Sequence, residues 1–165
     1  PADRLNHGID AHSDFECLTI LHVTHPGLQL LSSDDHWVET PPVKDCFTIL
    51  VGDCLEAWTG GYLKATQHRV GNRGVERFSL PFFFSADYDC EVRPQSPFDT
   101  VEALAAYPKF KAGEHLYSRT IAVFPYLRNL VDQGELAIDF EVEEESSFKR
   151  LSVEERALLE NNAQK

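Results

Sequence analysis

Two histidines and an aspartate form the first group of residues whose types and spacing could hold a metal ion. His12 and Asp14 are two positions apart, and His68 follows Asp14 after 53 intervening residues, in a segment predicted to be extended. Because side chains at i and i+2 of a strand point to the same face, His12 and Asp14 are expected to converge. Two imidazoles and one carboxylate leave coordination positions open, an arrangement that suits oxygen chemistry at Fe(II).

By themselves, these three residues are weak evidence for a metal site. In a chain with seven histidines, a His-x-Asp triplet arises by chance about as often as not. A single histidine on a strand is more often a hydrogen-bonded core residue than a metal ligand. That simpler interpretation is applied to the remaining histidines: His7, His22, His25, His36 and His115.

An arginine and a serine form a second group, which begins nine residues after His68. Arg77 and Ser79 begin an apolar, β-favouring run and are expected to share a face. A guanidinium group binds a carboxylate with two parallel hydrogen bonds, and a nearby hydroxyl adds another. A small dicarboxylate bound to the metal at its other end would provide this anion. The tripeptide recurs at residues 150–152, so Arg-x-Ser by itself has no diagnostic value.

Composition limits the kinds of partner. The net charge of −12 argues against nucleic acid, whose phosphates require clustered lysine and arginine. No apolar run is long enough to cross a membrane. Four cysteines without a Cys-x-x-Cys pair, in a chain with no secretory signal, indicate reduced thiols and a cytoplasmic location. We therefore expect a small-molecule substrate, and the sequence leaves the oligomeric state open.

Short segments separated by turns predict a mainly β protein, an antiparallel sandwich or barrel such as a jelly roll, with flanking helices. Phe82 and Phe84 are expected in its core. The strands are expected at residues 15–23, 27–31, 36–39, 46–51, 62–70, 77–84 and 88–92, with a helical turn at 55–59.

Helical segments dominate from residue 97 onward. Helices are expected at 100–107 and 112–123, with Pro125 interrupting the second, and a capping box at 152–155 predicts a last helix through 161. We therefore expect residues 1–124 to form the jelly-roll core with its supporting helix. Residues 125–165 are expected to form an acidic helical extension.

The joint pattern is His-x-Asp, 53 residues, His, eight residues, Arg-x-Ser, and it resembles the isopenicillin N synthase-like family of Fe(II)/2-oxoglutarate-dependent oxygenases. Further blocks extend the resemblance, in order, over about residues 8–120. They are AHSDF at 11–15, LTIL at 18–21, PGLQL at 26–30, WV at 37–38, PP at 41–42, VGD at 51–53, HRVGN at 68–72, ERFSLPFFF at 76–84 and AGE at 112–114.

The resemblance implies a double-stranded β-helix in which His12, Asp14 and His68 are the catalytic iron ligands. It implies that Arg77 and Ser79 bind the distal carboxylate of 2-oxoglutarate. With Fe(II), 2-oxoglutarate and O2, such an enzyme oxidises a C–H bond of a small organic substrate by hydroxylation, desaturation or oxidative cyclisation, here expected in secondary metabolism. The family's long helical N-terminal region and first core strand do not precede His12, so the chain is expected to be a C-terminal catalytic part.

Three alternatives remain open at this point. One is an oxidase that does not use 2-oxoglutarate, like isopenicillin N synthase, in which Arg-x-Ser would hold a substrate carboxylate. Another is a non-catalytic jelly-roll binding module, and a third is a zinc hydrolase with the same three ligands. Neither the substrate nor the choice among hydroxylation, desaturation and cyclisation can be read from the residues.

Overall fold

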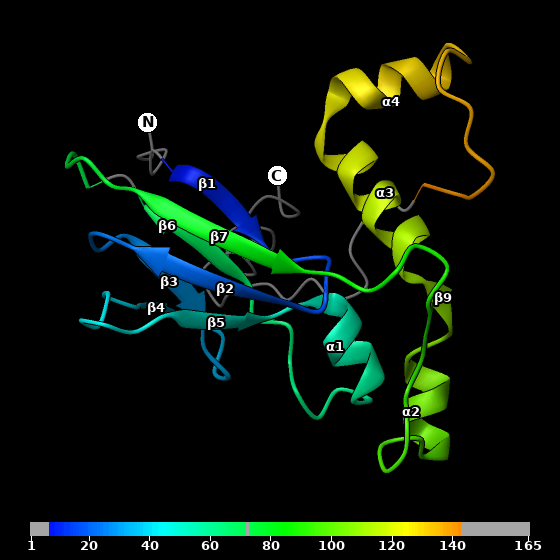
Figure 1. Ribbon diagram of the computed structural model, residues 1–165, viewed down its shortest axis with the longest axis horizontal. Helices are drawn as coiled ribbons and strands as arrows, with labels where there is room; N and C mark the ends of the chain where they lie inside the picture. Colours follow the sequence, from blue (N-terminus) through cyan, green and yellow to red (C-terminus); the bar gives the residue numbers. More distant parts are fainter. Residues whose placement is uncertain (1–6, 72, 143–165) are drawn as a thin grey trace, which may run out of the picture.

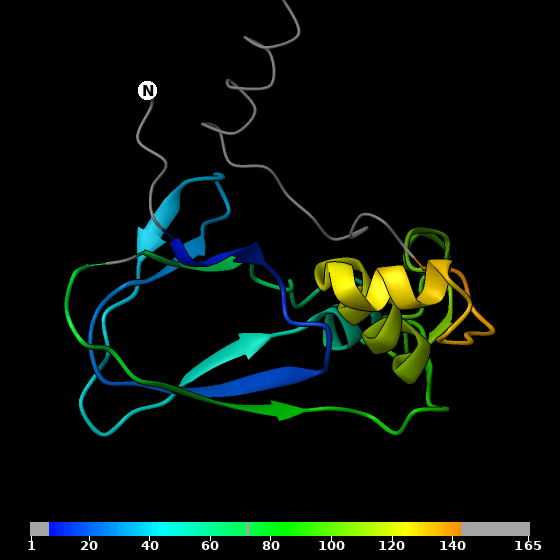
Figure 2. The ribbon, with the colours of Figure 1, turned by 90° about the horizontal axis from the view of Figure 1, so that it is seen from above.

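The computed structural model describes residues 7–71 and 73–142, and it contains two antiparallel β-sheets facing each other beside a group of helices (Figures 1 and 2). The four-stranded sheet has the order β1 (His7–His12), β6 (His68–Gly71), β3 (Leu28–Leu31) and β4 (Trp37–Glu39). The three-stranded sheet has the order β5 (Thr48–Val51), β2 (Leu18–Val23) and β7 (Ser79–Phe84). The expectation of a mainly β, antiparallel protein is therefore confirmed.

The helices lie together at one end of the sheets (Figure 1). They are α1 (Asp53–Trp58), α2 (Val101–Ala106), α3 (Ala112–Val123) and α4 (Pro125–Asp132), and the short strands β8 (Glu91–Val92) and β9 (Phe110–Lys111) pair between them. Pro125 is the first residue of a separate helix, α4. Proline is tolerated there because the N–H groups of the first helical turn have no partner within the helix.

Alternating apolar residues on β2 explain how the sheets pack. Leu21 and Val23 are buried and face the opposite sheet, and they form a cluster with Leu28 of that sheet and with Leu50 of the neighbouring strand β5. Burying each such side chain stabilises the fold by about 1.5–3 kcal/mol. A second buried cluster of Cys17, Cys54, Ala57, Val92 and Ala112 joins α1 and the β8–β9 pair to the end of the sheets. No helix among the described residues is long and apolar enough to cross a bilayer.

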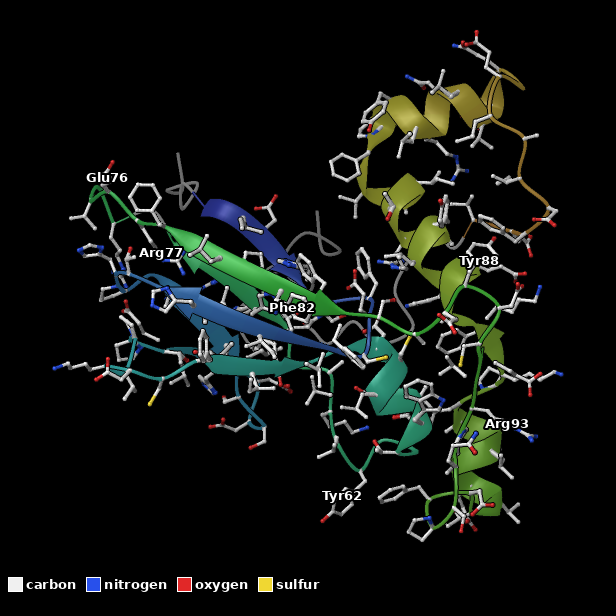
Figure 3. The ribbon with its side chains drawn as sticks, in the orientation of Figure 1. Tyr62, Glu76, Arg77, Phe82, Tyr88 and Arg93 are labelled. Atoms are coloured by element: carbon white, nitrogen blue, oxygen red, sulfur yellow. The ribbon has the colours of Figure 1, made fainter. Side chains whose placement is uncertain are left out.

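Several predicted elements are shorter in the structure. The segment 15–23 becomes a strand only at Leu18, and the segment 62–70 only at His68. The prediction that Phe82 and Phe84 lie in the core is wrong, because 61% and 54% of their surfaces are exposed. Both are on the outer face of the edge strand β7, where Figure 3 labels Phe82. The helix expected at 152–161 lies outside the described residues.

Candidate metal centre

The two candidate histidine ligands are direct neighbours across a pair of strands. His12 is the last residue of β1 and His68 is the first residue of β6, and the antiparallel register pairs them. Their ring centroids are 4.2 Å apart. Asp14 completes the group, since one potential donor atom from each of the three residues lies within 4.8 Å of the others. The structure therefore brings together the three residues that the sequence predicts as ligands.

The position of Asp14 does not follow from the alternation of side chains along a strand. β1 ends at His12, so Asp14 lies in the loop that leads to β2 rather than on the same strand. The backbone N–H of Asp53 donates to the Asp14 carbonyl over 2.9 Å and holds this loop against the start of α1. The close approach requires Gly52, because a Cβ there would lie 2.3 Å from the carbonyl oxygen of Glu16.

Backbone carbonyls set which nitrogen of each histidine faces the group. Nδ1 of His12 lies 2.8 Å from the Asp10 carbonyl oxygen, and Nδ1 of His68 lies 3.1 Å from that of Thr66. A carbonyl only accepts, so each Nδ1 donates, and in the neutral imidazole Nε2 is then the nitrogen that keeps the lone pair. Those Nε2 atoms lie 3.7 Å (His12) and 3.5 Å (His68) from Oδ1 of Asp14. Two imidazole nitrogens and one carboxylate oxygen therefore face a common point.

The surroundings of His68 favour the form of this residue that binds a metal. Burial, assisted by the neighbouring His12, lowers the pKa of His68 and so favours the neutral imidazole that a metal requires. Asp14 is only 6% exposed, and the Thr19 hydroxyl donates to its Oδ2. Among the described residues the cluster has three members, not the four of a closed structural zinc site. This donor set fits Fe(II) with open coordination positions.

Arg77 is half-buried at the start of β7 and has an unused donor (Figure 3). Its Nε donates to the His25 carbonyl over 3.1 Å, and its Nη1 donates to Ser79 Oγ. Within the described part of the chain, the buried Nη2 has no hydrogen-bond partner. Burial lowers the pKa of Arg77. An unpaired buried donor is costly, so this guanidinium group fits an anionic ligand.

The guanidinium lines a pocket beside the strands that carry the histidines. The pocket measures about 270 Å³, and Ile9, Val70 and Arg73 also line it. Ile9 pairs with Val70 one step along the same β1–β6 ladder that pairs His12 with His68. Ile9 lies three positions before His12 on β1, which corresponds to at most about 10 Å. The proximity of the two groups suits a small molecule with an anionic group at each end.

The sequence-based reasoning missed Thr19, which contacts Asp14 directly. Its signal was a polar residue at an inward-facing position of a largely apolar strand, two positions from the buried Cys17 and Leu21 on either side. Asp53 was also missed as a backbone support for the Asp14 loop. Neither contact can be predicted from spacing in the sequence, because both depend on how the loop at residues 13–17 folds back on α1.

Comparison with known proteins assigns the class. A family model described as the 2OG-Fe(II) oxygenase superfamily matches residues 1–86, more than half of the chain. The chain belongs to this superfamily.

Individual relatives agree with this assignment. The 2-oxoglutarate-dependent dioxygenase tropC of Talaromyces stipitatus is 30% identical over 115 residues, which cover 68% of this chain and 33% of the relative. A 2OG-Fe(II) oxygenase family protein from Caulobacter crescentus has a similar structure, with a TM-score of 0.61 and 33% identity over 75% of this chain and 42% of that chain. JOX2, crystallised with 2OG, Fe and JA, has a TM-score of 0.61 and 28% identity over 70% of this chain and 34% of its own. The chain spans about a third of the length of the curated relatives it matches.

Proposed function

We propose that this chain forms the iron-binding part of an Fe(II)- and 2-oxoglutarate-dependent oxygenase that oxidises a C–H bond of a small organic substrate. The outcome would be hydroxylation, desaturation or oxidative cyclisation, in secondary metabolism. The observation that carries the proposal is the convergence of His12, Asp14 and His68 in a member of this superfamily. These three residues are the proposed ligands, and Arg77 with Ser79 is the proposed site for the distal carboxylate of 2-oxoglutarate.

The finer assignments rest on the same observations. The two facing antiparallel sheets support a double-stranded β-helix, and the ordered sequence blocks support the isopenicillin N synthase-like subfamily. Residues 1–124 are the proposed oxygenase core. Residues 125–165 are the proposed extension, which begins with α4 packed against α3.

The chain's own residues have binding and orienting roles in this proposal. Bound Fe(II) would supply the activation of O2, with 2-oxoglutarate as the source of electrons. His12 and His68 would bind the ion through their Nε2 atoms, and Asp14 would bind it through Oδ1, which faces both of them. Arg77 and Ser79 would hold the far carboxylate and so orient the cosubstrate along the interior of the sheets. The remaining coordination positions stay available for cosubstrate and O2.

Oxygen consumption tests the proposed reaction. The purified protein is supplied with Fe(II), O2 and candidate substrates, with and without 2-oxoglutarate, and succinate is measured alongside oxygen. We expect succinate to form only when 2-oxoglutarate is present. Oxygen uptake with substrate alone would indicate the oxidase alternative. Metal binding without turnover would indicate a binding module, and hydrolysis with Zn(II) would indicate a zinc hydrolase.

Replacing Arg77 with leucine tests the carboxylate site. We expect the dissociation constant for 2-oxoglutarate to rise roughly 10- to 100-fold, because charge-assisted hydrogen bonds contribute about 1.5–3 kcal/mol. Anaerobic titration of the metal-loaded protein measures it. Arg73→Leu is the matched control, since Arg73 lines the same pocket but is paired with Glu39. Equal affinities in wild type and Arg77→Leu would exclude Arg77 from the site.

A further inference from the structure

Thr19 is a buried hydroxyl in the middle of the three-stranded sheet. It is 2% exposed, and it faces the opposite sheet on the same side of β2 as Leu21 and Val23. On the neighbouring strands its register partners are Leu50 and Phe83. A hydroxyl in such an apolar row is costly unless it is hydrogen-bonded. Its bond to Oδ2 of Asp14 meets that requirement.

The bond gives the two oxygens of Asp14 different surroundings. Oδ2 accepts from Thr19, whereas Oδ1 faces Nε2 of His12 at 3.7 Å and Nε2 of His68 at 3.5 Å. The terminal torsion of an aspartate is broad and roughly two-fold, so the carboxylate has little intrinsic preference for one orientation. The hydrogen bond from the Thr19 hydroxyl to one oxygen therefore sets the orientation of the carboxylate and leaves the other oxygen facing the two imidazoles.

We propose that Thr19 is a positioning residue of the metal centre, whose hydroxyl fixes Asp14 so that it presents a single oxygen to the ion. The inference rests on the proposed function, because it takes Asp14 as a ligand. With Oδ2 engaged by Thr19, the carboxylate binds through Oδ1 alone, and a coordination position stays open for cosubstrate. Without the hydroxyl, the carboxylate can rotate, and both of its oxygens can then occupy coordination positions of the ion.

Binding of Co(II) to the metal-free full polypeptide tests this role without requiring turnover. For Thr19→Val, which keeps the shape and removes the hydroxyl, we expect the Co(II) dissociation constant to rise about 10- to 100-fold, the usual loss for a residue that supports a ligand. We also expect its visible Co(II) absorption to change. Thr19→Ser keeps the donor and should restore the wild-type affinity and spectrum. Thr19→Ala gives a second measurement if the valine variant does not fold.

Thr120→Val is the matched control, because the Thr120 hydroxyl donates to the Leu116 carbonyl within α3. It should bind Co(II) like the wild type. Wild-type affinity and spectrum in Thr19→Val would overturn the proposal, as would a serine variant as weak as the valine variant. Failure of the metal centre itself has a different signature: the wild-type protein would bind Co(II) no better than Asp14→Ala does.

Discussion

Replacing Asp14 with alanine is expected to weaken Fe(II) binding by at least about 100-fold, beyond the range seen for residues that only support ligands, and to abolish succinate formation. Asp14 supplies the negative charge in the group, and its Oδ1 lies within 3.7 Å of both imidazole Nε2 atoms. Without it, two neutral rings 4.2 Å apart remain to hold a dication. Anaerobic metal titration and succinate formation measure the two effects.

Asp10→Ala is the matched control for this substitution. Asp10 is an exposed aspartate on the same strand, and it is the Asp10 backbone carbonyl, unaffected by the change, that accepts from Nδ1 of His12. We expect its Fe(II) affinity to stay within about twofold of wild type, as for most surface substitutions. If Asp14→Ala also kept its affinity, the ion would bind elsewhere and the candidate centre would be wrong.

The convergence of His12, Asp14 and His68 could be predicted from residue types and order, but the reason for it could not. The pattern placed His12 and Asp14 on one strand, whereas β1 ends at His12 and Asp14 lies in the loop that follows. The pairing of His12 with His68 depends on the register of β1 against β6. Alternation predicts which face a side chain occupies, while register follows from the packing of the whole sheet.

Local signals predicted some elements well and could not place others. α3 spans the expected residues 112–123, since its boundaries follow from local helix-forming residues. The aromatic run of β7 was correctly assigned to a strand, but its burial depends on which strands lie beside it. Phe82 and Phe84 lie on the outer face of the sheet, opposite the face that packs in the core, and they are exposed. Thr19 escaped prediction for a related reason, since its partner comes from a loop.

Replacing His115 with leucine is expected to lower the free energy of unfolding by about 1–3 kcal/mol, the usual cost of leaving a buried polar group without its hydrogen-bond partner. Nε2 of His115 on α3 lies 3.0 Å from Oδ2 of Asp53 at the start of α1, and the Asp53 side chain is fully buried. The substitution removes the imidazole that is hydrogen-bonded to this side chain. Urea denaturation, analysed as a two-state transition, measures the change.

A surface pair of the same residue types provides the matched control. His36 Nδ1 lies 3.6 Å from Oδ2 of Asp34, and both side chains are largely exposed, so His36→Leu should change the free energy of unfolding much less than His115→Leu does. Adding Asp53→Asn to His115→Leu should recover part of the loss, because a neutral amide costs less to bury without this partner than a carboxyl group that can ionise. Equal losses in His115→Leu and His36→Leu would show that the buried pair does not stabilise the contact between α3 and α1. Since the Asp53 N–H also holds the Asp14 carbonyl, a confirmed loss would link the helices to the loop that carries the candidate ligand.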